Sequence, residues 1–144
     1  MAGQRKESSV DLSSAMTIAA AGMKVQSARL RVTAENLANS ESTAQAPGGD
    51  PFRRKTVSFA SRHDPGTGLD LVDIRRYGVD RGDFELRYQP GHPAADAAGY
   101  VKYPNVNPLI ELADMREAQR SYEANLNVLQ LARTMIGRTL DLLR

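Results

Sequence analysis

The sequence predicts a mainly α-helical protein, in which long N- and C-terminal helices pair as a coiled-coil-like unit beside a small β-containing, loop-rich middle region. Apolar residues recur at helical spacing near both ends, turn-forming residues gather between them, and only 6% of the 144 residues are aromatic. Apolar steps of three and four residues mark a helix that buries one stripe against a partner helix. We expect residues 1–40 and 107–144 to be the helices of this core, and residues 41–106 to be the loop and small β-containing region.

The strongest helical pattern lies in the C-terminal segment. Asn107 can cap the helix, Pro108 suits its first position, and acidic residues near the start complement the helix dipole. The positions on one predicted seam are Leu112, Met115, Gln119, Tyr122, Leu126, Leu129, Arg133, Ile136, Leu140 and Leu143. Because eight of these ten positions are apolar or aromatic, we expect this seam to pack against the N-terminal helix.

The N-terminal helix is predicted to follow a polar segment, residues 1–8, to start near Ser9 or Asp11, and to run to about Asn39. A seven-residue repeat with small residues between its members forms one seam: Met16, Ala20, Met23, Ser27, Leu30, Ala34 and Leu37. A second apolar row lies on the opposite face: Ile18, Val25 and Val32. A helix with two opposed apolar faces must pack against another helix or another molecule on each face.

Two arrangements satisfy that need. The helix is either central in a small bundle, or its second face packs against another molecule; we favour the second, because the chain has only two strong helical stretches. Leu30 either faces the C-terminal helix of its own chain while Val32 faces a neighbouring subunit, or the two faces are assigned in reverse, because the pattern gives their opposition and not their partners. Gly22 and Gly137 each interrupt a helical pattern, either as tolerated surface residues or at a close helix approach.

The middle of the chain predicts strands and turns. Residues 40–51 have the composition of a loop, and residues 52–103 combine short apolar segments with Pro-Gly turns. Leu86 and Tyr88 alternate with charged residues, which predicts a half-buried strand.

Composition argues against several function classes. The net charge of +2 is spread over the whole chain, which argues against nucleic acid as an electrostatic partner. The chain has no cysteine, its longest apolar run is about half the roughly 20 residues of a membrane span, and no phosphate loop or nucleophile motif is present. His63 and His92 have no ligand-type residue at metal-binding spacing. We expect no enzyme activity, no cofactor, no metal site and no membrane span.

One basic cluster, Arg53-Arg54-Lys55, admits two interpretations. It is the cluster that a small nucleic-acid-binding domain would use for phosphate contacts. A solvated strand edge that discourages sheet pairing is the commoner use of such charges.

Two stretches resemble a known family. Residues 30–39 (LRVTAENLAN) resemble the Asn-Leu-Ala-Asn signature of the flagellar rod and hook axial proteins. Residues 99–107 (GYVKYPNVN), with Pro-Gly-His-Pro before them, are similar to the proximal-rod members of that family, and residues 120–125 (RSYEAN) to their C-terminal helix. The resemblance covers both ends of the chain strongly, whereas residues 52–83 match poorly.

The resemblance implies a structural subunit of the bacterial flagellar basal-body proximal rod. Such a subunit assembles helically around the export channel, with itself and with other rod proteins, and transmits torque. The implied partners are other copies of the chain, other rod proteins, the rod-base adaptor and the flagellar export apparatus. The implied location is the rod where it crosses the periplasm, reached by export without a cleaved signal peptide. The alternative is a secreted coiled-coil adaptor or export chaperone that does not polymerise.

The residues expected at the assembly interface are Met23, Leu30, Val32, Asn36, Leu37, Asn39, Leu112, Tyr122, Asn125, Leu126, Leu129, Ile136 and Leu140. The leucines and Ile136 are expected to fill the seams. Asn36 and Asn39 are expected to supply amide hydrogen bonds where the first helix ends, with a local helix cap as the alternative for Asn39.

Overall fold

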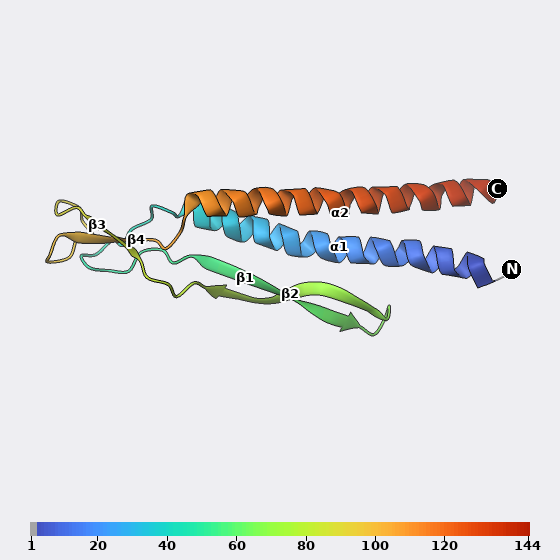
Figure 1. Ribbon diagram of the computed structural model, residues 1–144, viewed down its shortest axis with the longest axis horizontal. Helices are drawn as coiled ribbons and strands as arrows, with labels where there is room; N and C mark the ends of the chain where they lie inside the picture. The colour runs from blue at the N-terminus through green and yellow to red at the C-terminus, as the bar shows by residue number, and fades with distance from the viewer. Residues whose placement is uncertain (1–2) are drawn as a thin grey trace. The chain divides into compact units, whose positions relative to one another are not determined.

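The computed structural model describes residues 3–144, and the side chains of residues 12–144. Its elements are α1 (Gly3–Ala38), β1 (Lys55–Asp64), β2 (Leu69–Val79), β3 (Glu85–Tyr88), β4 (Tyr100–Tyr103) and α2 (Pro108–Leu142) (Figure 1). A long helix near each end and a small β-containing middle are therefore confirmed, while coiled-coil pairing stays a prediction.

Helix α1 begins earlier than expected. It starts at Gly3 instead of near Ser9 or Asp11, because no proline or other strong helix breaker separates these positions. The predicted polar segment is thus helical over residues 3–8, and residues 1–2 lie outside the described part. At the other end, the backbone N–H and the side-chain Nδ2 of Asn39 both donate to the carbonyl of Glu35, at 3.1 and 2.8 Å. Asn39 is therefore the local helix cap that the sequence left as an alternative.

Helix α2 begins as predicted. The Asn107 side-chain Oδ1 accepts the backbone N–H of Leu109 at 3.1 Å, and its carbonyl accepts the N–H of Glu111 at 3.1 Å. Pro108 occupies the first helical position, where no backbone donor is required.

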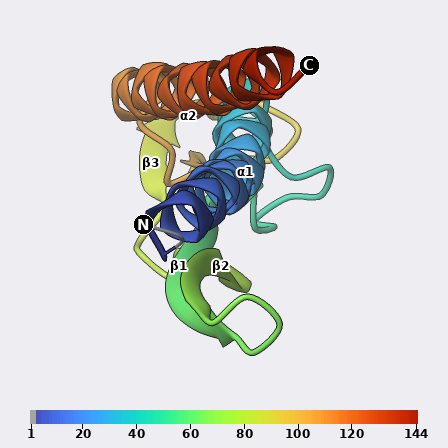
Figure 2. The ribbon, with the colours of Figure 1, turned by 90° about the vertical axis from the view of Figure 1, so that its right-hand side faces the viewer.

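The strands form two separate two-stranded sheets, β1–β2 and β3–β4. The turn between β1 and β2 is closed by Asp64, whose carboxylate accepts the N–H of Gly66 at 3.3 Å and the hydroxyl of Thr67 at 2.7 Å. Gly68 follows with φ of 72°, a left-handed conformation that suits glycine. Figure 2 shows the twist of this hairpin, which is the usual behaviour of a two-stranded ribbon.

The β3–β4 sheet is antiparallel, with Glu85 opposite Tyr103 and Tyr88 opposite Tyr100. Val101 and Tyr103 are buried on one face, packed with Ala94. Leu86 and Tyr88 point to the other face and are 60% and 66% exposed. The expectation that the apolar residues of this strand are the buried ones is therefore wrong.

The contacts of Arg87 explain why the charged face of β3 is the covered one. The guanidinium of Arg87 lies over the ring of Tyr103 at 4.0 Å and forms ion pairs with Glu41 at 3.1 Å and Glu85 at 3.0 Å. A cation over an aromatic face, held by two carboxylates, is a favourable arrangement for a partly covered arginine. This arrangement directs the charged residues of β3 to the covered side.

The chain divides into two compact units. The first comprises residues 1–28, 58–75 and 117–144, and the second comprises residues 29–57 and 76–116. The buried apolar side chains described in the first unit are small: Ala19, Val25, Ala28, Ala118 and Ala132. The second unit buries the apolar side chains of Val32, Ala94, Val101, Tyr103 and Val106. It also buries three polar or charged side chains: Thr33, Asn36 and Glu111.

The buried line of α2 differs in part from the predicted seam. Five predicted residues are partly buried as expected: Met115, Tyr122, Leu126, Leu129 and Ile136. Between them, the covered positions are one residue earlier than predicted: Glu111, Ala118, Asn125 and Ala132. The other predicted seam residues are exposed: Leu112, Gln119, Arg133, Leu140 and Leu143. This rotation places small side chains in the seam and leaves Gln119 and Arg133 in solvent.

Close packing explains the preference for small residues. Within the first unit, a Cβ atom added to Gly22 of α1 would lie 2.6 Å from Nδ2 of Asn125 on α2. Gly22 therefore marks a close helix approach. A Cβ atom on Gly137 would meet nothing within 4 Å, so Gly137 is a tolerated surface glycine.

The two apolar faces of α1 are covered to different extents. Val25 and Val32 are buried within their own units, and Ile18 is 50% exposed. The predicted seam is less covered: its leucines and methionines are partly buried, and Ala20, Ser27 and Ala34 are exposed. Val32 is therefore a core residue of the subunit. This fits the reverse assignment that the sequence pattern also permits, and contact of either face with a neighbouring subunit stays a prediction.

Candidate functional site

The histidines take structural roles. His63 Nδ1 lies 2.8 Å from a carboxylate oxygen of Asp70, and both side chains are mostly exposed. His92 Nδ1 accepts the backbone N–H of Ala94 at 3.0 Å, as expected for a turn residue. Among the described residues, no group of three or more His, Cys, Asp or Glu side chains is placed to hold a metal ion. No helix in the described part has the length and apolar character of a membrane span.

The side chain of Asn36, near the end of α1, is fully buried. Its Nδ2 donates to the carbonyl of Lys55 at 2.9 Å, and its Oδ1 accepts the backbone N–H of Lys55 at 2.8 Å. The amide thus provides both hydrogen bonds that a neighbouring strand would provide at the first residue of β1. This pair of hydrogen bonds fixes the start of β1 against the last turns of α1.

The carboxylate of Glu111, in the first turn of α2, is also fully buried. Its Oε1 accepts a hydrogen bond from Nε of Arg54, and its Oε2 accepts one from Nδ2 of Asn36 at 3.3 Å. A buried charge is tolerated only when it is paired and hydrogen-bonded. We call these four residues, Asn36, Arg54, Lys55 and Glu111, the polar node.

Further contacts hold Arg54 in position. Its backbone N–H donates to Oδ1 of Asn105 at 2.8 Å, and its guanidinium lies 3.9 Å from carboxylate oxygens of Asp80 and of Asp114. Arg29 donates to the carboxylate of Asp114 at 3.3 Å. The node therefore joins the end of α1, the start of β1 and the first turn of α2 within one unit.

The sequence predicted only part of this node. The amide hydrogen bonds expected of Asn36 are present, and they are buried inside the chain. The interpretation of Arg53-Arg54-Lys55 as a solvated strand edge is wrong for Arg54, and Glu111 was considered only as a helix-dipole residue. Arg54 and Glu111 are 57 positions apart, so no local spacing indicates their contact.

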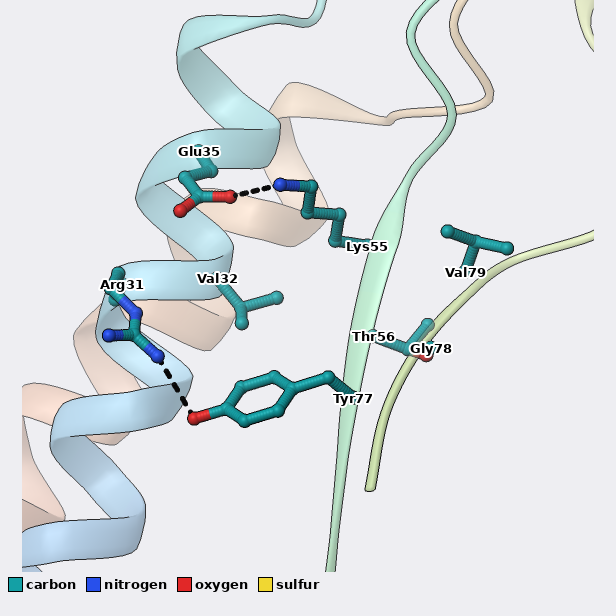
Figure 3. Close-up of a pocket in the computed structure, with 8 residues that line it drawn as sticks. All are labelled: Arg31, Val32, Glu35, Lys55, Thr56, Tyr77, Gly78 and Val79. Carbon is teal, nitrogen blue, oxygen red and sulfur yellow. Dashed lines mark hydrogen bonds and ion pairs between the residues drawn. The ribbon is translucent and has the colours of Figure 1, made fainter. Parts of the chain in front are cut away.

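A groove lies between α1 and the β1–β2 hairpin, with a volume of about 520 Å³. Its lining residues are Arg31, Val32, Glu35, Lys55, Thr56, Tyr77, Gly78 and Val79. Figure 3 shows two polar links from helix to hairpin: Glu35 with Lys55 at 2.8 Å, and Arg31 with the Tyr77 hydroxyl at 2.9 Å. The Lys55 ammonium, by hydrogen bonding and charge, lowers the pKa of Glu35 below its ordinary value of 4.5.

A second surface lies on the later half of α2. Val128, Leu131 and Met135 are 45%, 62% and 46% exposed, and they follow one another at i, i+3 and i+7. Residues at that spacing share one face of a helix. We call these three residues the apolar stripe.

The predicted interface residues fall into three groups. Val32 and Asn36 are buried, and Leu112 and Leu140 are exposed. The others are partly buried: Met23, Leu30, Leu37, Asn39, Tyr122, Asn125, Leu126, Leu129 and Ile136. Their role at an interface between subunits stays a prediction.

Comparison with known proteins shows the family to which the chain belongs. Residues 97–142 match a family model described as flagellar basal body rod FlgEFG protein C-terminal. The chain is 56% identical over 133 residues to the flagellar basal-body rod protein FlgC of Agrobacterium fabrum, covering 92% of this chain and 96% of that relative. The chain belongs to the FlgC family of flagellar basal-body rod proteins.

More distant relatives agree with this assignment. The FlgC of Escherichia coli O6:H1 is 41% identical over 125 residues, which cover 87% of this chain and 92% of the relative. The FlgC of Bacillus subtilis is 33% identical over 142 residues, which cover 88% and 95%. The resemblance seen in the sequence is thus confirmed, and the chain is a structural component of the basal-body rod.

Proposed function

We propose that the chain assembles helically, with copies of itself and with other rod proteins, around the export channel of the proximal rod. In this role it transmits torque and carries out no catalysis. The two long helices form the packed core of the assembled rod, and the β-containing middle lies outside it. The observation that carries the proposal is the apolar stripe.

The stripe supports assembly because its three side chains remain substantially exposed on the chain alone. Fully burying a valine, leucine or methionine side chain contributes about 1.5–3 kcal/mol relative to leaving it exposed. Part of that free energy is still to be gained, since each stripe residue is 45–62% exposed. A helix face at i, i+3 and i+7 is also the pattern by which helices pack on one another. Contact between subunits through this face would realise the gain.

Other parts of the proposal concern partners and location. The chain reaches the rod through the flagellar export apparatus without a cleaved signal peptide, and there it contacts the rod-base adaptor and other rod proteins. The predicted interface residues Leu112 and Leu140 are exposed and remain available for such contacts. Membership of the basal-body rod family supports this part of the proposal.

The test compares two substitutions with the same charge change on neighbouring positions. Leu131→Asp places a carboxylate in the stripe, whereas Gln130→Asp places one on an exposed position that is already polar. Each variant replaces the natural protein in the cell, and the amount of chain in purified basal bodies is measured by quantitative mass spectrometry. We expect Leu131→Asp to be depleted at least tenfold, because a carboxylate in an apolar contact costs several kcal/mol, and Gln130→Asp to be incorporated normally.

Two results contradict the proposal. One is equal incorporation and equal swimming for both variants, which would show that the stripe stays in solvent. The other is absence of the unsubstituted chain from basal bodies together with a stable soluble complex, as expected for an adaptor or chaperone.

A further inference from the structure

The outer edge of strand β3 carries backbone groups that point away from its sheet. The sheet has two strands, so β3 pairs with β4 on one side and with no strand on the other. Gln89 donates its N–H to the carbonyl of Gly99 at 2.9 Å, and this bond shows which residues are bonded pairs in the ladder. Because bonded and non-bonded pairs alternate along an antiparallel ladder, the N–H and C=O groups of Leu86 and Tyr88 point away from β4.

Tyr100, which lies opposite Tyr88 on β4, follows the same pattern. Its N–H donates to a carboxylate oxygen of Asp96 at 3.0 Å, and its carbonyl accepts the N–H of Asp96 at 2.9 Å. Both outward groups of Tyr100 are thus satisfied from outside the sheet. Within the part of the chain that the structure describes, no such partner is found for the outward groups of Leu86 and Tyr88.

Other strand edges of the chain are protected by side chains. Asn36 satisfies both backbone groups of Lys55 at the start of β1, at 2.9 and 2.8 Å, and Asp96 does the same for Tyr100 on β4. Lys102, the next outward residue of β4, adds a lysine to that edge, which discourages pairing with a further strand. Leu86 and Tyr88 have no comparable protection. An unprotected edge of this kind is a template for an added strand.

The side chains beside this edge are apolar and held in place. Leu86, Tyr88 and Tyr100 are 60%, 66% and 43% exposed, and the two tyrosine rings meet edge to face with their centres 5.3 Å apart. The Tyr88 ring also lies against Gly99, where an added Cβ atom would be 2.9 Å from the ring. Tyrosines fixed in this way are typical anchors of protein interfaces, because covering them costs little conformational entropy.

The charge beside these side chains is already matched. Lys102 lies opposite Leu86 and therefore shares its face of the sheet. Its ammonium lies 3.1 Å from a carboxylate oxygen of Asp50. The face formed by Leu86, Tyr88, Tyr100 and Lys102 thus presents no surplus charge. The complementary ligand is an extended peptide segment with uncharged, apolar side chains at alternate positions.

We infer that the outer edge of β3 receives an extended segment of a different rod protein, which adds to the sheet as a third strand. The outward groups of Leu86 and Tyr88 form its backbone hydrogen bonds, and the leucine and the tyrosines cover its apolar side chains. Pairing of two β3 edges from two copies is symmetric and closes as a dimer, whereas the proposed assembly is helical. This inference rests on the proposed function, and it names one contact within that assembly.

The length of the edge decides how the contact is tested. Strand β3 has four residues, so an added strand gains few hydrogen bonds. Such a short edge holds a segment that other contacts of the assembly have already brought close, because their connection raises its effective concentration. The experiment therefore uses the complete chain in purified basal bodies.

A matched pair of variants removes the outward donor of Leu86. Leu86→Pro and Leu86→Ala both lose the leucine side chain, but only proline also removes the N–H. That N–H takes no part in the pairing with β4, so both purified chains should unfold at similar urea concentrations. We expect quantitative mass spectrometry of basal bodies to find roughly tenfold less Leu86→Pro than Leu86→Ala, because an added strand loses a hydrogen bond and meets the proline ring.

A photo-cross-link identifies the partner and does not depend on how Leu86→Pro folds. The photoreactive residue p-benzoylphenylalanine replaces Tyr88 in the otherwise natural chain. Basal bodies purified from these cells are irradiated, and the cross-linked peptides are identified by mass spectrometry. We expect cross-links to one short segment of a different rod protein.

The outcomes are distinguishable. Equal incorporation of folded Leu86→Pro and Leu86→Ala would overturn this inference. An incorporated chain that cross-links from position 88 only to its own copies, or to nothing, would overturn it as well, and both results leave the proposed function intact. Absence of the unsubstituted chain from basal bodies would overturn the proposed function, and this inference with it.

Discussion

The side-chain amide of Asn36 pairs with the backbone of Lys55 in both directions, donating to its carbonyl at 2.9 Å and accepting its N–H at 2.8 Å. The same Nδ2 lies 3.3 Å from the buried carboxylate of Glu111. One side chain therefore holds the first residue of β1 and the first turn of α2 at the end of α1. The asparagine of the family signature thus acts inside the subunit.

The first prediction concerns a variant in which residue 36 lacks the amide donor. Asn36→Asp keeps the shape of the side chain but places a second carboxylate beside Glu111 and ends the bond to the Lys55 carbonyl. We expect the free energy of unfolding to fall by about 3–5 kcal/mol, because an unpaired buried charge remains. Urea denaturation of the purified chain measures this change. The control Asn127→Asp lies on an exposed position and should stay within about 0.5 kcal/mol of the natural chain; equal effects in the two variants would show that the node is dispensable.

The second prediction compares the two helical glycines. Gly137→Ala adds a Cβ into open space and should raise the free energy of unfolding by about 0.5–1 kcal/mol through helix propensity. Gly22→Ala should not show this gain, because its Cβ would lie 2.6 Å from Nδ2 of Asn125. Adding Asn125→Ala should restore the gain, since it removes the clashing atoms. Thermal unfolding of these three variants beside the natural chain measures the differences, and a gain for Gly22→Ala without Asn125→Ala would argue against a close helix approach.

The third prediction concerns the corrected seam of α2. Ala118 is fully buried and Ala124 is exposed on the same helix. Ala118→Leu overfills the seam and should cost about 1–3 kcal/mol of unfolding free energy. Ala124→Leu adds the same atoms in solvent and should be nearly neutral. If Ala118→Leu were neutral as well, the buried line of α2 would have to pass elsewhere.

The fourth prediction concerns the ion pair between Glu35 and Lys55 in the groove. The hydrogen bond from the Lys55 ammonium lowers the pKa of the Glu35 carboxyl below 4.5. The ion pair therefore stabilises the fold above pH 4.5, and this stabilisation is lost as the pH falls through the lowered pKa. Lys55→Met should therefore raise the pKa of Glu35 toward its ordinary value, as followed by NMR titration of the Glu35 carboxyl carbon. Asp73 is an internal control, because its pKa is lowered chiefly by the hydrogen bond from Lys24. An unchanged pKa of Glu35 would show that the pair is absent in solution.

The sequence allowed the helices to be predicted because their signals are local. Asn107 and Pro108 fix the start of α2 through bonds within four residues, and repeats of three and four residues identify both helices. The face of α2 that is buried was harder to predict. The seam holds small side chains at Ala118 and Ala132, whereas the apolar spacing predicts that the larger leucines nearby are buried.

The polar node and the orientation of β3 depend on contacts that are distant in the sequence. Arg54 meets Glu111 only after the β-containing middle has folded back. Arg87 faces the covered side because Tyr103, on another strand, offers its ring. Alternation of apolar and charged residues identifies a strand correctly in β3, but it does not show which face the rest of the fold will cover.

Cryo-EM of purified basal bodies tests the central claim most directly, because it shows where the chain lies and what covers its helix. We expect density for this chain in the proximal rod, with Val128, Leu131 and Met135 of α2 packed against a neighbouring subunit. A rod that contains the chain with these three side chains facing solvent, or a complete rod that lacks the chain, would contradict it.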